Sequence, residues 1–362
     1  MPLVSFDQEQ NLFILKYNQT EESRPLYFST PLEFKEITNS ARYDFFVFYK
    51  QCPESDIFNL TLDDKTVGMI FPIQALLSNS HDKSDNEFFL KSAYATYEHC
   101  LKELTPEKIE KILDSENIFD NYTIGNIYSE NTVFAVIYRQ FILEKYNLEI
   151  NSLSLISSLF EKGYFSKQKS LSDLILNSAD IDSNIDIKLI PESLCQEEYL
   201  TSFFKELIFD IHPLAQFHFK YQIIELLMEK ILYDQLEKLE NKLKNKQIIV
   251  SVFQRRISDF SSEDKRIKLL FSRYSSISRC ELKDELTENL KEVLKNLGRL
   301  EEIEAENDGN SIGVHILLYK FRNLVVHDYR SIATNNVETF KNINRVLNIL
   351  LIDLLRNFHM PS

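Results

Sequence analysis

Glycine and tryptophan are scarce in this chain of 362 residues, which contains six Gly and no Trp. No Gly-x-Gly-x-x-Gly or Gly-x-x-x-x-Gly-Lys-Ser/Thr motif occurs, which excludes the loops that commonly bind dinucleotides or nucleotide phosphates. The four cysteines lie far apart, without a Cys-x-x-Cys pair. This spacing predicts neither a zinc site nor a disulfide framework.

Long apolar segments are also missing. The chain does not open with the hydrophobic region of a signal peptide, and no run of 18 apolar residues occurs. We therefore expect no membrane association and a reducing, cytoplasmic compartment. His212, His218 and Glu225 lack the close spacing of metal ligands, so we interpret the two histidines as packing residues and expect no metal or cofactor.

Apolar side chains and acidic charge are plentiful. The chain is 44% hydrophobic, with 27 Phe and 17 Tyr, which is enough to form the cores of two domains or more. The net charge is −14, but the acid is concentrated in residues 1–198, with 17 Lys and Arg against 32 Asp and Glu. Residues 242–283 instead carry 11 basic and 4 acidic residues. A basic block in an acidic protein is a candidate binding surface for a polyanion.

Residues 1–80 are predicted to be β-rich, and residues 81–190 helical. Short aromatic and β-branched runs predict strands at 12–17, 42–49 and 57–62, with turns at 52–55 and 63–68. Helical spacing begins near Asn86, and Pro106 resembles the first residue of another helix. Helices are also predicted over 131–146 and 153–176. The two regions form either separate domains or one, and the polar stretch 177–186 is the expected boundary to the rest of the chain.

Residues 195–362 are predicted to form an all-α, up-and-down helical bundle. Apolar residues at helical spacing predict one long helix that begins at Pro213, followed by helices over 263–275, 281–298, 312–328 and 336–358. Gly298 fits the C-cap of the third helix, and the acidic stretch 301–311 is expected to be a loop. The predicted fold class is therefore α+β, with a β-rich N-terminal region and a helical C-terminal bundle.

One segment near the C-terminus combines three polar residues suited to chemistry on phosphate: Arg322, Asn323 and His327. Asn323 and His327 are four residues apart, so a helix places them on one face. That face lies opposite the predicted core stripe of Val314, Leu318, Phe321 and Val325. Apolar residues accompany the polar pair, which predicts a second packing surface, most simply for a partner subunit; these residues are Ile316, Tyr319 and Val326.

The run Arg322-Asn-Leu-Val-Val-His-Asp-Tyr329, late in a predicted helical bundle, resembles the Arg-x4-His signature of the HEPN superfamily, especially its larger prokaryotic members implicated in phage defence. The resemblance covers about residues 199–362. It implies a homodimer in which two motifs meet in one cleft, and RNA cleavage without metal by Arg322, Asn323 and His327. It also makes Glu225 the best-placed acid to hold the arginine, and Tyr329 a counterpart of the modified tyrosine of some toxins.

The basic block is predicted to hold RNA by its phosphates. Its candidate residues are Arg255, Arg256, Arg266, Lys268, Arg273 and Arg279. Structural interpretations stay open beside these functional ones. The block is alternatively a solvated face that the acidic stretch 281–308 neutralises. Glu225 is alternatively an ordinary surface carboxylate. Arg322 and His327 are alternatively partners of carboxylates where two helices meet.

The leading hypothesis is a metal-independent endoribonuclease that acts as a toxin or effector in anti-phage defence (abortive infection). Residues 1–198 would sense a phage trigger or bind a regulatory protein. One alternative is a non-catalytic module of the same shape that dimerises or binds a partner. Another is the toxin of a toxin–antitoxin pair, controlled by modification of Tyr329.

Overall fold

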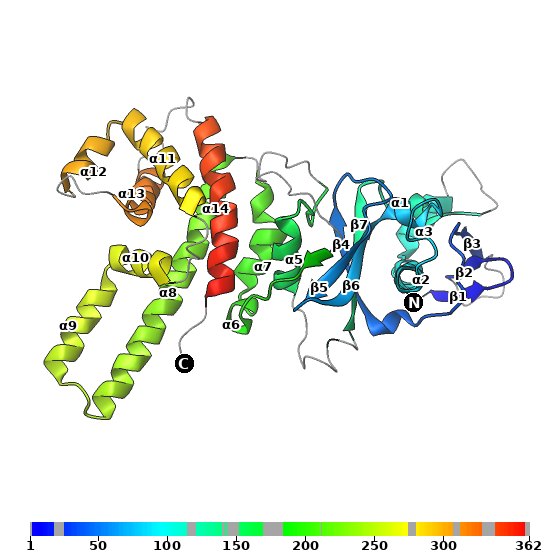
Figure 1. Cartoon of the computed structure of the whole chain (residues 1–362), viewed down its shortest axis with the longest axis horizontal. Helices are drawn as coiled ribbons and strands as arrows, with labels where there is room; N and C mark the ends of the chain where they lie inside the picture. Colours follow the sequence, from blue (N-terminus) through cyan, green and yellow to red (C-terminus); the bar gives the residue numbers. More distant parts are fainter. Residues whose placement is uncertain are drawn as a thin grey trace. The chain divides into compact units, whose positions relative to one another are not determined.

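The computed structural model describes residues 2–17, 25–113, 121–139, 142, 152–168, 184–210, 212–273, 280–306, 312–327 and 337–358 (Figure 1). These residues form two compact units. The first comprises the described residues up to 168 together with 184–188, and the second comprises those from 189 onward. The first unit contains β-sheets and helices, whereas every regular element of the second is helical. The mixed α+β class is therefore confirmed.

Two sheets form the framework of the first unit. Strands β1 (Leu3–Asp7), β2 (Leu12–Lys16) and β3 (Leu26–Ser29) form a three-stranded antiparallel sheet. The second sheet has five strands in the order β4-β7-β6-β5-β8, with only β5 and β8 parallel. Its strands are β4 (Tyr43–Tyr49), β5 (Phe58–Leu62), β6 (Lys65–Pro72), β7 (Thr132–Tyr138) and β8 (Asn184–Asp186).

The turn predicted over 63–68 is much shorter in the structure. Asp63 and Asp64 alone form it, both with positive φ angles, of 49° and 60°, as a tight hairpin requires. Strand β6 then begins at Lys65 and includes Gly68. A Cβ at Gly68 would lie 2.2 Å from the carbonyl oxygen of Val136, so this glycine allows β6 to approach β7 rather than forming a turn.

The helix predicted over 131–146 is wrong over Thr132–Tyr138, which forms strand β7. The first six residues of β7 are buried, so both faces of the strand are covered. A strand covered on both faces shows no alternation of polar and apolar residues, which is why its periodicity was uninformative. The helix predicted over 153–176 is confirmed only as α5 (Ser152–Phe160); residues 161–168 are not helical, and residues beyond 168 lie outside the described ranges.

Helix α2 (Glu87–Lys102) contacts strands of both sheets and lies between them (Figure 1). It begins where the sequence predicted, because the Asn86 side chain accepts a hydrogen bond from the Phe89 backbone at 2.9 Å. Its aromatic side chains pack with those of the small sheet; Tyr97 stacks on Phe13 with ring centroids 5.1 Å apart. Shorter helices complete the unit: η1 (Ser40–Arg42), α1 (Ile73–Leu76), α3 (Pro106–Leu113) and η2 (Ile124–Asn126).

The second unit contains nine α-helices among its described residues. They are α6 (Glu192–Cys195), α7 (Glu198–Lys205), α8 (Pro213–Lys244), α9 (Val250–Ser261), α10 (Glu263–Arg273), α11 (Cys280–Asn296), α12 (Leu300–Glu306), α13 (Val314–His327) and α14 (Val337–Asn357), with the 3-10 helix η4 (Leu207–Phe209). None of the described helices is long and apolar enough to cross a lipid bilayer.

The long predicted helix is confirmed as α8, which begins at Pro213, and the other four predicted helices correspond to α10, α11, α13 and α14. Gly298 ends the α11 region with a φ of +66°, as a C-cap glycine should. The predicted loop at 301–311 is wrong over 301–306, which belong to α12. Ile303 is the buried residue of this acidic helix, which contacts α11.

Helix α8 packs against α10, α13 and α14, and α11 packs against α13 and α14. Phe321 of α13 lies at the centre, with its ring centroid 4.8 Å from that of Phe217 on α8 and 5.2 Å from that of Phe340 on α14. The second half of α8 and the whole of α9 project from this core as a two-helix hairpin (Figure 1). Helix α13 is thus fixed by neighbours on its apolar side.

Candidate functional site

The burial of α13 determines which of its side chains are accessible. Leu317, Leu318, Phe321 and Val325 are buried, so the predicted core face is confirmed, with Leu317 in place of the half-buried Val314. The three residues of the predicted motif lie off this face. Arg322 and Asn323 are half-buried, and His327, the last residue of the helix, is exposed.

Arg322 is held in place by two hydrogen bonds. Its Nη2 donates to Oε1 of Glu225 at 2.6 Å, and its Nη1 donates to Oδ1 of Asn323 at 3.1 Å. Glu225 lies on α8, 97 residues earlier in the chain. The structure therefore brings together Arg322 and the acid that the sequence singled out for it. Burial disfavours the charged guanidinium, but the hydrogen bond and negative charge of Glu225 outweigh this effect and raise the pKa of Arg322.

A tyrosine and a second carboxylate complete the surroundings of Arg322. The guanidinium carbon lies 5.5 Å from the centroid of the Tyr221 ring, within the range of a cation–π contact. The Tyr221 hydroxyl donates to Oε1 of Glu263 at 3.3 Å. Burial, followed by the charge of Glu263, raises the pKa of Tyr221, so this phenol stays protonated at neutral pH. The network joins α8, α10 and α13 around one arginine.

His327 presents a free imidazole. It is exposed, and no side chain in the described part of the chain forms a hydrogen bond or ion pair with it. Its position four residues after Asn323 places both on the face that α13 turns away from its core. A group that exchanges protons must reach its substrate, and this histidine is accessible. Tyr329 and Arg279, two other predicted site residues, lie outside the described residues.

The predicted RNA-binding block is divided between two helices. Arg255 and Arg256 are exposed on α9, in the projecting hairpin, whereas Arg266, Lys268 and Arg273 belong to α10. Helix α10 packs against α13, and α9 packs against α8 and α10. The structure thus places the α10 residues on a neighbour of the motif helix.

Electrostatics identify the contact between α10 and the start of α13. Burial lowers the pKa of His315 on α13; the negative charge of Asp264 opposes this shift and the positive charge of Lys268 reinforces it. Lys268 itself is exposed and has no hydrogen-bond or ion-pair partner among the described residues. A basic side chain therefore lies free beside the helix that carries Arg322.

Acidic residues of the 281–306 segment pair elsewhere. Glu285 binds Arg345 at 2.9 Å, and Glu306 binds Lys320 at 2.6 Å. Within the basic block, Lys265 pairs with Asp259 at 2.9 Å. None of these three pairs joins the basic block to the later acidic helices.

His212 and His218 each lie next to a polar neighbour. The His218 ring lies 3.2 Å from the side-chain nitrogen of Gln222, and the backbone N–H of His212 donates to Asp210 at 2.8 Å. The described residues contain no group of three His, Cys, Asp or Glu side chains placed to hold a metal ion.

Sequence reasoning missed Tyr221 and Glu263. Tyr221 precedes Glu225 by four residues and so shares its side of the helix. That spacing is the signal by which it could have been found. Glu263 gives no comparable signal, because its contact with Tyr221 depends on how α10 packs against α8.

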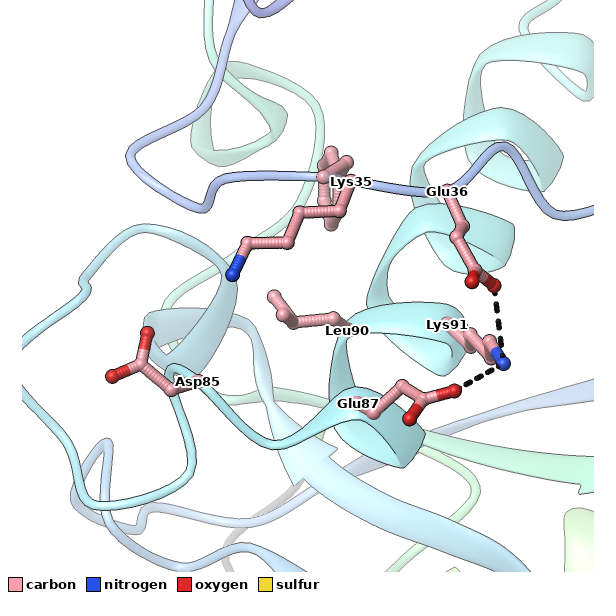
Figure 2. A pocket seen from close by; sticks show the side chains of 7 residues that line it. Lys35, Glu36, Asp85, Glu87, Leu90 and Lys91 are labelled. Atoms are coloured by element: carbon pink, nitrogen blue, oxygen red, sulfur yellow. Dashed lines mark hydrogen bonds and ion pairs between the residues drawn. The ribbon is translucent and has the colours of Figure 1, made fainter.

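A separate cavity of about 320 Å³ lies in the first unit, beside the start of α2. Lys91 bridges Glu87 at 2.6 Å and Glu36 at 3.2 Å on one side, and Lys35 extends over the other side near Asp85 (Figure 2). The wall includes Phe34 and Leu90. The cavity lining carries charges of both signs, and Lys91 is already paired with Glu36 and Glu87. The lining therefore does not favour one kind of ligand.

Comparisons of the chain with known protein families, with curated proteins and with solved structures found no match. What the site does must therefore be inferred from the chemistry and placement of Arg322, Asn323 and His327.

Proposed function

We propose that the protein is a metal-independent endoribonuclease of the HEPN type, with Arg322, Asn323 and His327 as its catalytic residues. One observation carries the proposal. A fixed arginine and an accessible histidine lie five residues apart on a single helix, and the Asn323 side chain accepts a hydrogen bond from the arginine. This arrangement supplies a cation for phosphate and an accessible side chain that can accept or donate a proton.

The chemistry needs only proton transfer and charge stabilisation. The 2′-hydroxyl oxygen of the RNA attacks the adjacent phosphorus and loses its proton, while the bond from phosphorus to the 5′-oxygen breaks and that oxygen gains a proton. Histidine can accept or donate these protons. The guanidinium of Arg322 stabilises the negative charge that develops on the phosphoryl oxygens. The products are a 2′,3′-cyclic phosphate and a 5′-hydroxyl.

A homodimer through the helical unit fits this chemistry. One histidine cannot act as base and acid in the same step, and a second copy supplies another His327. The outward face of α13 also carries Val326, an apolar residue that is 40% exposed beside the motif. Covering that side chain with a second copy would bring two motifs together.

The basic residues of α10 are proposed to hold the RNA strand. Lys268 and Arg273 are exposed on this helix, which packs against α13. Contacts of this kind bind phosphate regardless of base and weaken as salt rises. The first unit would then sense a trigger, such as a phage component, or bind a regulatory protein, which is the role expected in an anti-phage effector.

The test is RNA cleavage by purified protein in the presence of a metal chelator. Arg322→Ala and His327→Ala should each lower the rate by roughly 10²-fold or more, the usual contribution of general acid–base catalysis. Lys320→Ala is a matched control, because Lys320 lies on the same helix and pairs with Glu306 instead. Equal cleavage by all three variants, or complete dependence on a divalent ion, would refute the proposal.

A non-catalytic dimerisation or partner-binding module is the second candidate. It is favoured by the ion pair between Arg322 and Glu225, since an arginine engaged by a carboxylate can be purely structural. This reading predicts that pure protein does not cleave RNA. It also predicts that His327→Ala leaves self-association unchanged, which analytical ultracentrifugation would measure.

A further inference from the structure

Tyr319 lies on the same outward face of α13 as the proposed catalytic residues. At about 100° per residue, its side chain leaves the helix about 40° from Asn323 and about 60° from Arg322. The buried residues Leu317, Leu318, Phe321 and Val325 mark the other side. The direction of Tyr319 from the helix axis therefore falls between those of the arginine and the asparagine, one turn earlier on α13.

Tyr319 lacks a polar or aromatic partner among the described residues. It is half-buried, yet it forms no hydrogen bond or ring contact with any described residue. Other half-buried or buried tyrosines of this unit are satisfied: Tyr199 donates to Gln222 at 2.6 Å and Tyr221 donates to Glu263. A covered tyrosine usually has both an apolar contact and a hydrogen bond. Tyr319 is therefore available to contact a ligand.

The charges around Tyr319 select the kind of contact. Arg322 lies one turn later on α13, and the positive charge of Lys268, on the neighbouring helix α10, acts on His315 one turn earlier. An aromatic ring on a helix with basic side chains nearby matches a nucleotide, which presents a stackable base and an anionic phosphate together. In a duplex the base faces are already stacked on one another, so only an unpaired nucleotide can use the ring.

We propose that Tyr319 is the platform on which an unpaired RNA base next to the scissile phosphate stacks. This inference rests on the proposed ribonuclease activity. Stacking would hold the nucleotide with its phosphate near Arg322, one turn further along α13. The side chain would act on substrate binding, and the proton transfers would remain with His327.

The experiment compares Tyr319→Leu, Tyr319→Phe and the matched control Tyr233→Leu. Tyr233 is 62% exposed on α8 and likewise has no partner among the described residues. Cleavage is measured on one RNA sequence offered as an unstructured strand and within a duplex. The wild-type protein should prefer the single strand. Tyr319→Leu should raise KM roughly 5- to 150-fold, the range expected for loss of one stacked base, with a smaller change in kcat. Tyr319→Phe should retain the wild-type KM.

Binding gives a readout that does not need catalysis. A single-stranded RNA carrying the fluorescent base 2-aminopurine is titrated with His327→Ala protein, with and without Tyr319→Leu. Stacking on the ring should quench the fluorescence, and Tyr319→Leu should abolish the quench. If the protein does not cleave RNA but the quench depends on Tyr319, the proposed function fails and the stacking site stands.

Three results would overturn the inference. One is a Tyr319→Leu protein that binds and cleaves RNA like Tyr233→Leu. Another is equal loss in Tyr319→Phe, which would assign the effect to the hydroxyl group. The third is a change in self-association of Tyr319→Leu by analytical ultracentrifugation without a change in the quench, which would place the ring in a contact between two copies of the chain.

Discussion

Replacement of Glu225 tests the link between the structure and the proposed chemistry. The carboxylate holds Arg322 at 2.6 Å, and the two side chains are 37% and 24% exposed, respectively. Glu225→Gln keeps an oxygen that accepts the hydrogen bond from Nη2 but removes the charge. Glu225→Ala removes both. The two variants therefore separate the positioning of Arg322 from its charge balance.

The expected loss of stability is small, whereas the expected loss of activity is large. Solvent-exposed ion pairs stabilise proteins by about 0.2–1 kcal/mol, and this pair is only partly screened, so Glu225→Ala should lower the free energy of unfolding by about 1 kcal/mol. A displacement of a catalytic group by about 1 Å can reduce a rate by about 10²-fold. We therefore expect Glu225→Ala to lower kcat by roughly that factor, and Glu225→Gln to lower it less.

The assay is cleavage of a single-stranded RNA in the presence of a chelator, together with equilibrium unfolding in urea. Glu229→Ala is the matched control, because Glu229 is exposed one turn later on α8 and has no partner among the described residues. If Glu225→Ala cleaves RNA as fast as Glu229→Ala does, Glu225 does not position Arg322 for catalysis. If it cleaves faster than the wild-type protein, the ion pair restrains the arginine instead.

Three further predictions concern stability, each measured by equilibrium unfolding in urea. Phe321→Ala should lower the free energy of unfolding by about 3–5 kcal/mol, because a fully buried ring is lost, whereas Val326→Ala should change it by less than about 1 kcal/mol; similar losses would contradict the assigned core face. Lys220 is fully buried, and burial lowers its pKa well below that of a lysine in the unfolded chain. Unfolding therefore binds a proton at pH values between the lowered pKa of the folded state and the ordinary lysine pKa, and stability rises with pH across that window by at most about 1.4 kcal/mol per pH unit. Lys220→Met should remove this slope, and an unchanged slope would count against it. Gly68→Ala should destabilise the first unit, because its Cβ would lie 2.2 Å from the Val136 carbonyl oxygen, and a wild-type unfolding curve would show that β6 and β7 can separate there.

The helical half of the chain was the more predictable from sequence. Helices α8 and α13 each bury one stripe, so their apolar residues repeat at helical spacing and reveal both the element and its inner face. Strand β7 has no such signal, because its residues are buried on both sides. Its pairing with β4 and β6 depends on segments more than 60 residues away, which no local pattern specifies.

The candidate site was predictable in its residues but not in its contacts. The spacing of Asn323 and His327 on a helix follows from the sequence alone. The hydrogen bond from Arg322 to Glu225 spans 97 residues and exists because α8 and α13 pack side by side. The links from Arg322 to Tyr221 and Glu263 likewise arise from the packing of three helices. Local periodicity cannot supply such contacts.

The most direct test of the proposed activity is the chemical nature of the RNA ends made by pure protein in a chelator. We expect fragments that carry a 2′,3′-cyclic phosphate and a 5′-hydroxyl. The His327→Ala protein should form them at least about 10²-fold more slowly than the wild-type protein does. Fragments with 5′-phosphate ends, or the same rate from both proteins, would contradict it.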